Sequence, residues 1–215
     1  MLPFHAVIFD LDGTLADSIQ DLAEAMNQAL ADFGLPVHPI EAYKTFVGEG
    51  VDVMVRRAAT TNAKVPWQTL VDRYRDHYAA NDHRHTAPYP GIPELLDGLT
   101  AAGIKLAVLS NKRDDFTRAL IEKQFSKWKF VDVRGERDGV PRKPDPTAAF
   151  ELALALNVLP AKIAFVGDTA VDINTARNAG MRSVGCLWGF RGKAELVHAG
   201  ARDLLVRPTD LLTLE

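Results

Sequence analysis

The sequence predicts an α/β fold: a doubly wound parallel sheet into which an all-helical segment is inserted. Apolar runs typical of buried strands alternate with stretches of helical period, first at residues 6–9 and again from residue 104 onward. Between them, residues 16 to about 82 show helical patterns and no strand. Strands that alternate with helices form a parallel sheet covered on both faces. The 215 residues, 47% of them hydrophobic, are enough for one large domain or two modest ones.

The first predicted strand is the run Ala6-Val7-Ile8-Phe9, which is short and contains no charge. Asp10 and Asp12 follow it directly, and Gly13 and Thr14 then end the extended run. Side chains two residues apart in extended backbone point the same way, so both carboxylates are expected at the carboxyl end of this strand. That edge of a parallel sheet is where α/β proteins place their chemistry.

The inserted segment is predicted to contain four helices, each with its apolar residues on one face. The faces are Ile19, Leu22, Met26, Leu30 and Phe33; Tyr43, Phe46 and Val47; Val51, Met54, Val55 and Ala58; and Trp67, Leu70, Val71, Tyr74 and Tyr78. Prolines, a glycine and polar residues mark 83–91 as a surface linker, its two histidines included. We therefore expect a cap domain at 16–87 and a core domain formed by 1–15 and 88–215.

Strands and helices alternate again through the rest of the chain. Helices are expected around residues 95–99 and at 116–125, 147–156 and 173–179, and strands at 104–109, 130–133, 163–166, 183–187 and 204–206. Each predicted strand except the first and the last follows a helical pattern. This order completes the doubly wound sheet.

The composition excludes several classes of partner. The net charge of −3 gives no overall basic field for nucleic acid or an anionic membrane. The single cysteine, Cys186, cannot form an intrachain disulfide, and its apolar neighbours predict a buried, inert thiol. No signal peptide and no membrane-spanning run is recognised, so a cytoplasmic protein, monomeric or homodimeric, is expected.

The two aspartates after the first strand suit phosphoryl transfer. A carboxylate can attack phosphorus and form an aspartyl-phosphate, and Asp10 is assigned that role because it comes directly off the strand. One carboxyl group can then protonate the leaving alkoxide and later activate water, and Asp12 is placed for both steps. Taken alone, an Asp-x-Asp sequence is more typical of a solvated turn.

Two further segments offer groups that bind phosphate. Ser110 and Asn111 end the second core strand, where a hydroxyl and nearby backbone N–H groups can hold phosphate oxygens, although such a pair is also typical of a simple cap. Lys143, in a proline-rich loop, would neutralise the phosphate and the charge on Asp10, unless it is a solvated loop lysine. The adjacent Arg142 is the weaker candidate because neighbours in extended backbone point apart.

A third strand end supplies more acidic groups. The strand at 163–166 runs into Gly167 and Asp168, and Asp172 lies one helical turn further on. Hard oxygen ligands suit Mg²⁺, which takes few protein carboxylates and keeps several waters. Asp10, Asp168 and the main-chain carbonyl of Asp12 are the expected ligands. Asp172 is expected to orient Asp168, water or the lysine.

The order of these four motifs, D-x-D-G-T, S-N, K-P-D-P and G-D-x-x-x-D, resembles that of the haloacid dehalogenase-like superfamily. The helical insertion after the first motif resembles the first cap class of that superfamily. The resemblance implies a Rossmann-like core of strand order 5-4-1-2-3, a Mg²⁺ requirement and an aspartyl-phosphate intermediate. In that order the strands that end in Asp10 and Asp168 are neighbours.

Asp12 distinguishes between members of the superfamily. Its haloacid dehalogenases and phosphonatases differ at this position, so the chain resembles a phosphatase of small phosphate monoesters. The segments 46–50 (F-V-G-E-G), 110–112 (S-N-K) and 188–191 (W-G-F-R) are similar to those of phosphoglycolate phosphatases. Pyrophosphatases and β-phosphoglucomutases share the core motifs and stay open as alternatives. A receiver-like signalling module is a further alternative, disfavoured by Asp12 and the cap.

The cap is expected to select the substrate. A small phosphate ester leaves the sheet edge open to water, and the inserted helices are the candidate cover. Glycines that flank Glu49 permit close approach of backbone to ligand, and nearby cations can read a carboxylate, unless they are solvated surface charges. The candidate cap residues are Lys44, Gly48, Glu49, Gly50, Arg56 and Arg57.

Overall fold

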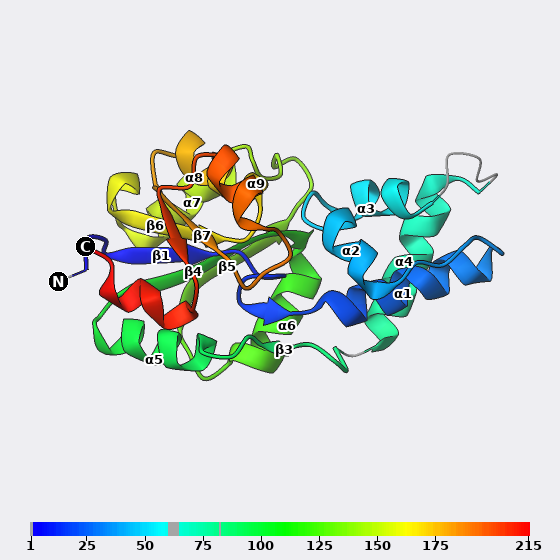
Figure 1. The fold of residues 1–215 in the computed structure, drawn as a ribbon, viewed down its shortest axis with the longest axis horizontal. Helices are drawn as coiled ribbons and strands as arrows, with labels where there is room; N and C mark the ends of the chain where they lie inside the picture. The colour runs from blue at the N-terminus through cyan, green and yellow to red at the C-terminus, as the bar shows by residue number, and fades with distance from the viewer. Residues whose placement is uncertain (1, 60–64, 82) are drawn as a thin grey trace.

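A six-stranded parallel sheet forms the centre of the part of the molecule that carries both termini (Figure 1). The computed structural model describes residues 2–59, 65–81 and 83–215, so residues 1, 60–64 and 82 of the predicted segments lie outside the described residues. The sheet order is β5-β4-β1-β6-β7-β8. The strands are β1 (Ala6–Phe9), β4 (Lys105–Arg113), β5 (Phe130–Glu136), β6 (Ile163–Gly167), β7 (Arg182–Cys186) and β8 (Asp203–Leu205). The predicted order of five strands is confirmed, and β8 extends the sheet beyond β7.

Helices cover both faces of this sheet, as the alternating pattern predicts (Figure 1). In β1, Val7 and Phe9 pack toward one face while Ala6 and Ile8 pack toward the other. The first face is covered by α5 (Ile92–Ala101), α6 (Asp114–Phe125) and the 3₁₀ helix η2 (Pro208–Thr213), and the second by α7 (Thr147–Leu156) and α8 (Ala170–Asn178). All four residues of β1 are fully buried, which explains why the strand is a continuous apolar run.

Four helices of the inserted segment lie at the end of the molecule opposite the termini (Figure 1). They are α1 (Ile19–Asp32), α2 (Ile40–Phe46), α3 (Val51–Ala58) and α4 (Trp67–Asn81). Their apolar faces form a hydrophobic cluster separate from those of the sheet, with Tyr43 and Tyr78 among its fully buried side chains. Phe190, from the loop after β7, also packs into this cluster. A separate apolar cluster supports a cap domain, which stays a prediction.

A two-stranded antiparallel ribbon joins the two parts of the molecule. It pairs β2 (Ala16–Asp17) with β3 (Ala87–Pro88), in the register Ala16 with Pro88 and Asp17 with Ala87. The expectation that residues 16–82 contain no strand is therefore wrong at Ala16–Asp17. Two residues are too few to show a period, and their pairing arises only because the outgoing and returning chains run side by side.

Several element bounds differ from those predicted. Strand β4 continues through Ser110, Asn111 and Lys112 because its backbone pairs with β5 as far as Arg113 and Glu136. Helix α8 begins at Ala170 and not at residue 173, because the Thr169 and Asp172 side chains form a capping box. The 3₁₀ helix η1 (Pro160–Lys162) and helix α9 (Lys193–His198) were not predicted. Among the described residues, no helix has the length and apolar character needed to cross a membrane.

Candidate active site

Three buried carboxylates meet at the carboxyl end of the sheet. Asp10 follows β1, Asp168 follows the neighbouring strand β6, and Asp172 lies in the first turn of α8. One oxygen of each lies within 4.8 Å of those of the other two. The backbone fixes this edge, because Asp10 N donates to Val166 O at 2.9 Å. The predicted convergence of Asp10 and Asp168 is therefore present in the structure.

Lys143 is the cation of this cluster. Its Nζ lies 2.8 Å from Asp10 Oδ1 and 2.7 Å from Asp172 Oδ1, and its side chain is 2% exposed. Burial opposes its charge, but Asp10 and Asp172 hold the pKa of Lys143 above its ordinary value. Asn111 fixes the loop that carries the lysine, since Lys143 N donates to Asn111 Oδ1 at 3.0 Å and Asn111 Nδ2 donates to Lys143 O at 3.1 Å.

The cluster carries more negative than positive charge. Burial, then repulsion by Asp172, raises the pKa of Asp10 from 3.8 to about 7, although Lys143 opposes this. Burial and the carboxylates of Asp172 and Asp10 also raise the pKa of Asp168 well above its ordinary value. Three carboxylates and one ammonium leave an excess of negative charge, which a divalent cation would neutralise. Carboxylate oxygens are hard donors, the kind that Mg²⁺ prefers. The residues present therefore fit a magnesium ion.

Asp172 and Asp168 accept hydrogen bonds from different partners. Both oxygens of Asp172 are engaged, Oδ1 by Lys143 and Oδ2 by Thr169 N at 3.1 Å and Thr169 Oγ1 at 2.8 Å. The orienting role of Asp172 stays a prediction. Asp168 accepts from Thr14 Oγ1 at 3.1 Å and from the backbone N–H of Phe190 at 2.8 Å.

Glycine is required close to Asp168 and Asp172. At Gly13, which has φ +86°, a Cβ would lie 2.5 Å from Asp168 Oδ2. At Gly167, a Cβ would lie 2.2 Å from the Cβ of Asp172. The predicted supporting role of Gly167 thus has a steric explanation: only glycine lets the strand end pass this close to the aspartate.

Asp12 is held away from the carboxylate cluster by a cation and a hydroxyl. Lys112 Nζ lies 2.7 and 2.8 Å from its two oxygens, and Ser18 Oγ donates to it at 2.6 Å. The strand ends at Phe9, so Asp10 and Asp12 do not share one extended run, which corrects the geometric basis of the prediction. Both still line the same cleft. Lys112, which the site prediction did not include, is the residue that fixes Asp12.

Ser110 and Asn111 both line the cleft, but they are engaged differently. Ser110 Oγ accepts from Lys112 N at 3.2 Å, so its hydroxyl hydrogen can still be donated to a ligand. Asn111 donates one amide hydrogen to Lys143 O and the other to Gly48 O, each at 3.1 Å. Its amide therefore positions the lysine and the cap in this structure. Phosphate binding by Ser110 and Asn111 stays a prediction.

The cleft lies between the sheet edge and the cap. It is lined by Asp10, Asp12, Leu22, Val47, Gly48, Gly50, Val51, Met54, Tyr74, Arg75, Ser110, Asn111, Lys112, Arg113 and Phe116. The two predicted cap glycines are among these residues, with φ of +118° at Gly48 and +99° at Gly50. Glu49 between them is instead ion-paired with Arg57. The structure thus brings the predicted glycine loop to the cleft that Asp10 also lines.

The three predicted cap cations are engaged outside the described cleft lining. Lys44 pairs with Glu41 at 2.8 Å, and the Arg56 guanidinium lies 5.2 Å from the ring centre of Trp67. Arg57 pairs with Glu49 and also donates to the carbonyls of residues 45 and 46, each at 3.2 Å. The cleft takes its cap cation from Arg75 of α4, which sequence reasoning missed.

Core side chains hold the glycine loop of the cap. Asn111 reaches Gly48 O, Arg191 donates to Val47 O at 3.0 Å, and Arg142 donates to Glu49 O at 3.1 Å. Arg142 is also ion-paired with Asp52 of α3. Arg142 and Lys143 contact different partners, as expected for neighbours that point apart. The contacts of Arg142 with the inserted segment were not predicted, because no local pattern identifies a partner 90 residues away.

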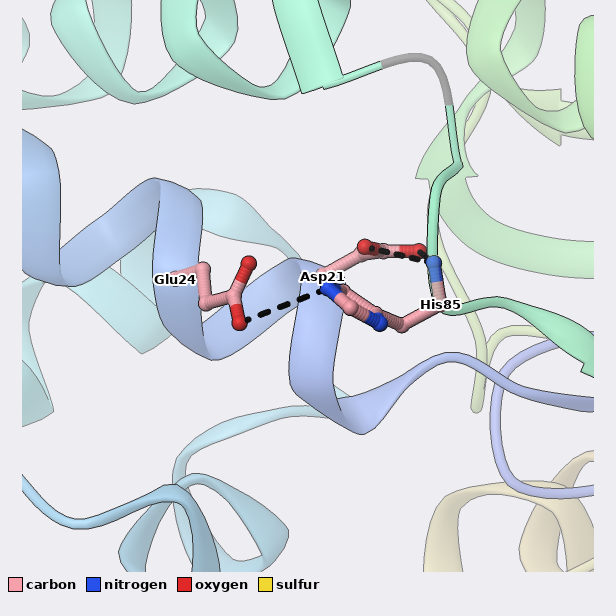
Figure 2. A group of neighbouring side chains, drawn as sticks. All are labelled: Asp21, Glu24 and His85. Carbon is pink, nitrogen blue, oxygen red and sulfur yellow. Dashed lines mark hydrogen bonds and ion pairs between the residues drawn. The ribbon is translucent and has the colours of Figure 1, made fainter.

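A second acidic group lies beside the linker, and Figure 2 shows how its members meet. The Asp21 carboxylate accepts from the backbone N–H of His85, at 3.1 Å to each oxygen, and from Asn81 Nδ2 at 3.0 Å. The His85 ring lies 3.7 Å from Glu24 (Figure 2). Asp21 is fully buried and satisfied by protein donors, so this group tethers the linker to α1.

The family match, the sequence relatives and a solved structure all relate this chain to the same group of hydrolases. Residues 7–186 match the family described as haloacid dehalogenase-like hydrolase. A phosphoglycolate phosphatase of Aquifex aeolicus is 32% identical over 211 residues, covering 98% of this chain and 96% of that protein. One from Pseudomonas syringae pv. tomato is 34% identical over 193 residues, covering 86% and 70%. The crystal structure of a predicted phosphoglycolate phosphatase from Haemophilus somnus superposes with a TM-score of 0.89 at 28% identity, covering 99% and 98%.

Proposed function

The chain belongs to the haloacid dehalogenase-like hydrolase family and is a phosphoric monoester hydrolase, and on that premise we propose that it hydrolyses 2-phosphoglycolate through an aspartyl-phosphate on Asp10. The observation that carries the proposal is the buried Asp10 carboxylate, held 2.8 Å from Lys143 Nζ at the sheet edge. Membership of a hydrolase family removes the receiver-module interpretation. The choice of substrate is supported by relatives of at least 32% identity that are phosphoglycolate phosphatases.

The first half of the reaction transfers the phosphoryl group to the protein. A carboxylate oxygen of Asp10 forms a bond to phosphorus while the bond to the ester oxygen breaks. Lys143 holds the attacking oxygen and offsets the negative charge of the phosphoryl group. The leaving alkoxide takes its proton from Asp12, which lines the same cleft.

The second half releases phosphate. Water attacks phosphorus, the acyl-phosphate bond breaks, and Asp12 accepts the proton of the water. Lys112 and Ser18 hold Asp12 in position for this step, at 2.7 and 2.6 Å. The cap covers the cleft, so that the only water that reacts is the one admitted after the alcohol has left.

Asp10 and Asp168 would hold the magnesium ion, with the main-chain carbonyl of Asp12 as a third ligand. Bound there, the ion would supply positive charge that neutralises phosphate oxygens and orients the ester. Asp172, whose carboxylate accepts from Lys143 and from Thr169, would hold the lysine beside Asp10 and so support the ligands.

The test is hydrolysis of 2-phosphoglycolate, pyrophosphate and β-glucose 1-phosphate with Mg²⁺ and with EDTA. We expect the highest kcat/KM for 2-phosphoglycolate, activity that depends on Mg²⁺, and none in an Asp10→Asn variant purified in parallel. A higher kcat/KM for pyrophosphate or for the sugar phosphate would assign the protein to one of those activities instead. Equal activity in the Asp10→Asn variant would contradict the assignment of the nucleophile.

A further inference from the structure

Most of the cap side chains that line the cleft are apolar, and α4 adds Tyr74 and Arg75. The side chains that α1, α3 and the glycine loop contribute among the described lining residues are Leu22, Val47, Val51 and Met54. A sugar phosphate needs hydrogen-bonding groups for its hydroxyls, because a buried hydroxyl without a partner is costly. This surface therefore suits a small organic group with few hydroxyls. Among these apolar side chains, a single charged group has a large effect on which phosphate ester binds.

Three cations line the cleft in the described part of the chain, and two of them already have a carboxylate at hydrogen-bond distance. Lys112 Nζ is paired with Asp12 at 2.7 Å. Arg113 Nε lies 2.6 Å from Asp115 Oδ1, and its guanidinium packs over a ring. Arg75 has a 3.7 Å contact with Asp72, one turn earlier on the same helix, which is too long for a hydrogen bond.

The position of Arg75 on α4 explains why it lines the cleft. Val71, Tyr74 and Tyr78 form the buried face of this helix, and Arg75 lies at the edge of that face, four residues after the first and three before the last. Its side chain is 29% exposed, so neighbouring groups cover most of it while it lines the cleft. Arg73, two residues earlier, points elsewhere and pairs with Asp32 of α1 at 2.5 Å.

We propose that Arg75 is the specificity-determining residue of the cap and binds an anionic group on the organic part of the substrate. The proposal rests on the proposed function and deepens it: Lys143 would hold the phosphate beside Asp10, and a carboxylate at the other end of a short molecule would meet the guanidinium. A guanidinium can bind a carboxylate through two parallel hydrogen bonds. This assigns to α4 the role that the sequence suggested for Lys44, Arg56 and Arg57.

The experiment compares Arg75→Met, Arg75→Lys and the matched control Arg73→Met on two esters of similar size. One is 2-phosphoglycolate, and the other is 2-hydroxyethyl phosphate, which carries an alcohol in place of the carboxylate. Loss of a hydrogen-bonded charge partner should lower kcat/KM of Arg75→Met for 2-phosphoglycolate by about 10- to 100-fold. Its activity on 2-hydroxyethyl phosphate should not change, Arg75→Lys should recover part of the loss, and Arg73→Met should behave like wild type on both esters.

The outcomes separate this inference from the proposed function. If wild type prefers 2-phosphoglycolate and Arg75→Met keeps the same preference, Arg75 does not read the charge, while the proposed function stands. Equal losses on both esters would show that Arg75 only shapes the cleft, and would also overturn the inference. If wild type does not hydrolyse 2-phosphoglycolate, the proposed substrate is wrong. The inference is then decided by whether Arg75→Met removes a preference for 3-phosphoglycerate over glycerol 3-phosphate.

Discussion

Replacing Asp10 by asparagine should abolish turnover and yet stabilise the metal-free protein at alkaline pH. Burial and the neighbouring Asp172 raise the pKa of Asp10 from 3.8 to about 7. The folded protein therefore binds this proton more tightly than the unfolded chain does, and its stability falls as the pH rises between these two values. A shift of this size corresponds to about 4 kcal/mol, a large part of the stability of a typical domain.

Asparagine has nearly the same shape as aspartate but carries no charge that burial can penalise. Lys143 keeps a carboxylate partner in the variant, because its Nζ also lies 2.7 Å from Asp172. In EDTA, the free energy of unfolding of Asp10→Asn relative to wild type should thus rise between pH 4 and pH 8, by up to about 4 kcal/mol. Below pH 4 the two proteins should differ little, since Asp10 is then protonated in both states.

Urea denaturation at pH 4, 6 and 8 measures this difference directly. Asp76→Asn is the matched control, because Asp76 has a 72% exposed side chain and its substitution should give no pH-dependent difference. Adding Mg²⁺ should stabilise wild type more than Asp10→Asn, because a ligand that binds only the folded state adds stability. If the relative stability of Asp10→Asn is the same at pH 4 and pH 8, the carboxylate does not carry the burial penalty inferred here.

Three further predictions concern the ion, the acid and the cap. Activity should disappear in EDTA and return with Mg²⁺, whereas Ca²⁺ should inhibit because it prefers longer bonds and more ligands; equal rates with both ions would contradict the Mg²⁺ site. Asp12→Ala should lose more activity on an alkyl phosphate than on p-nitrophenyl phosphate, whose leaving group needs little protonation, and equal losses would limit Asp12 to the metal site. Arg142→Ala should raise KM by weakening the contacts with Glu49 and Asp52, while the exposed-surface control Arg207→Ala should not; unchanged KM in both would show that these contacts do not hold the cap.

The sequence was sufficient to predict the sheet and the groups at its strand ends. The signals lie in short stretches of sequence. Asp10 and Asp168 each directly follow an apolar strand, and Lys143 lies between prolines. The parallel pairing of β1 with β6 is by itself enough to bring Asp10 and Asp168 to the same edge of the sheet. The convergence of these groups could therefore be inferred from the sequence alone.

The cap side of the site was not predictable in the same way. The period of helix α4 places Arg75 beside the buried face and Arg73 away from it, but it does not show that this edge of the helix meets the cleft. Only the packing of α4 against the cleft shows that. The pairing of Lys112 with Asp12, and of Asn111 with Gly48, likewise joins residues far apart in the chain. Long-range contacts of this kind leave no local pattern.

The central claim, that Asp10 is phosphorylated during hydrolysis, can be tested most directly by trapping the intermediate. Radiolabelled 2-phosphoglycolate is mixed with the Mg²⁺-loaded protein, quenched in acid within one turnover, and the labelled peptide is identified by mass spectrometry. The mechanism predicts label on the peptide that contains Asp10, and no label when EDTA replaces Mg²⁺ or in Asp10→Asn. Turnover of substrate without any label on Asp10, or label on another residue, would contradict it.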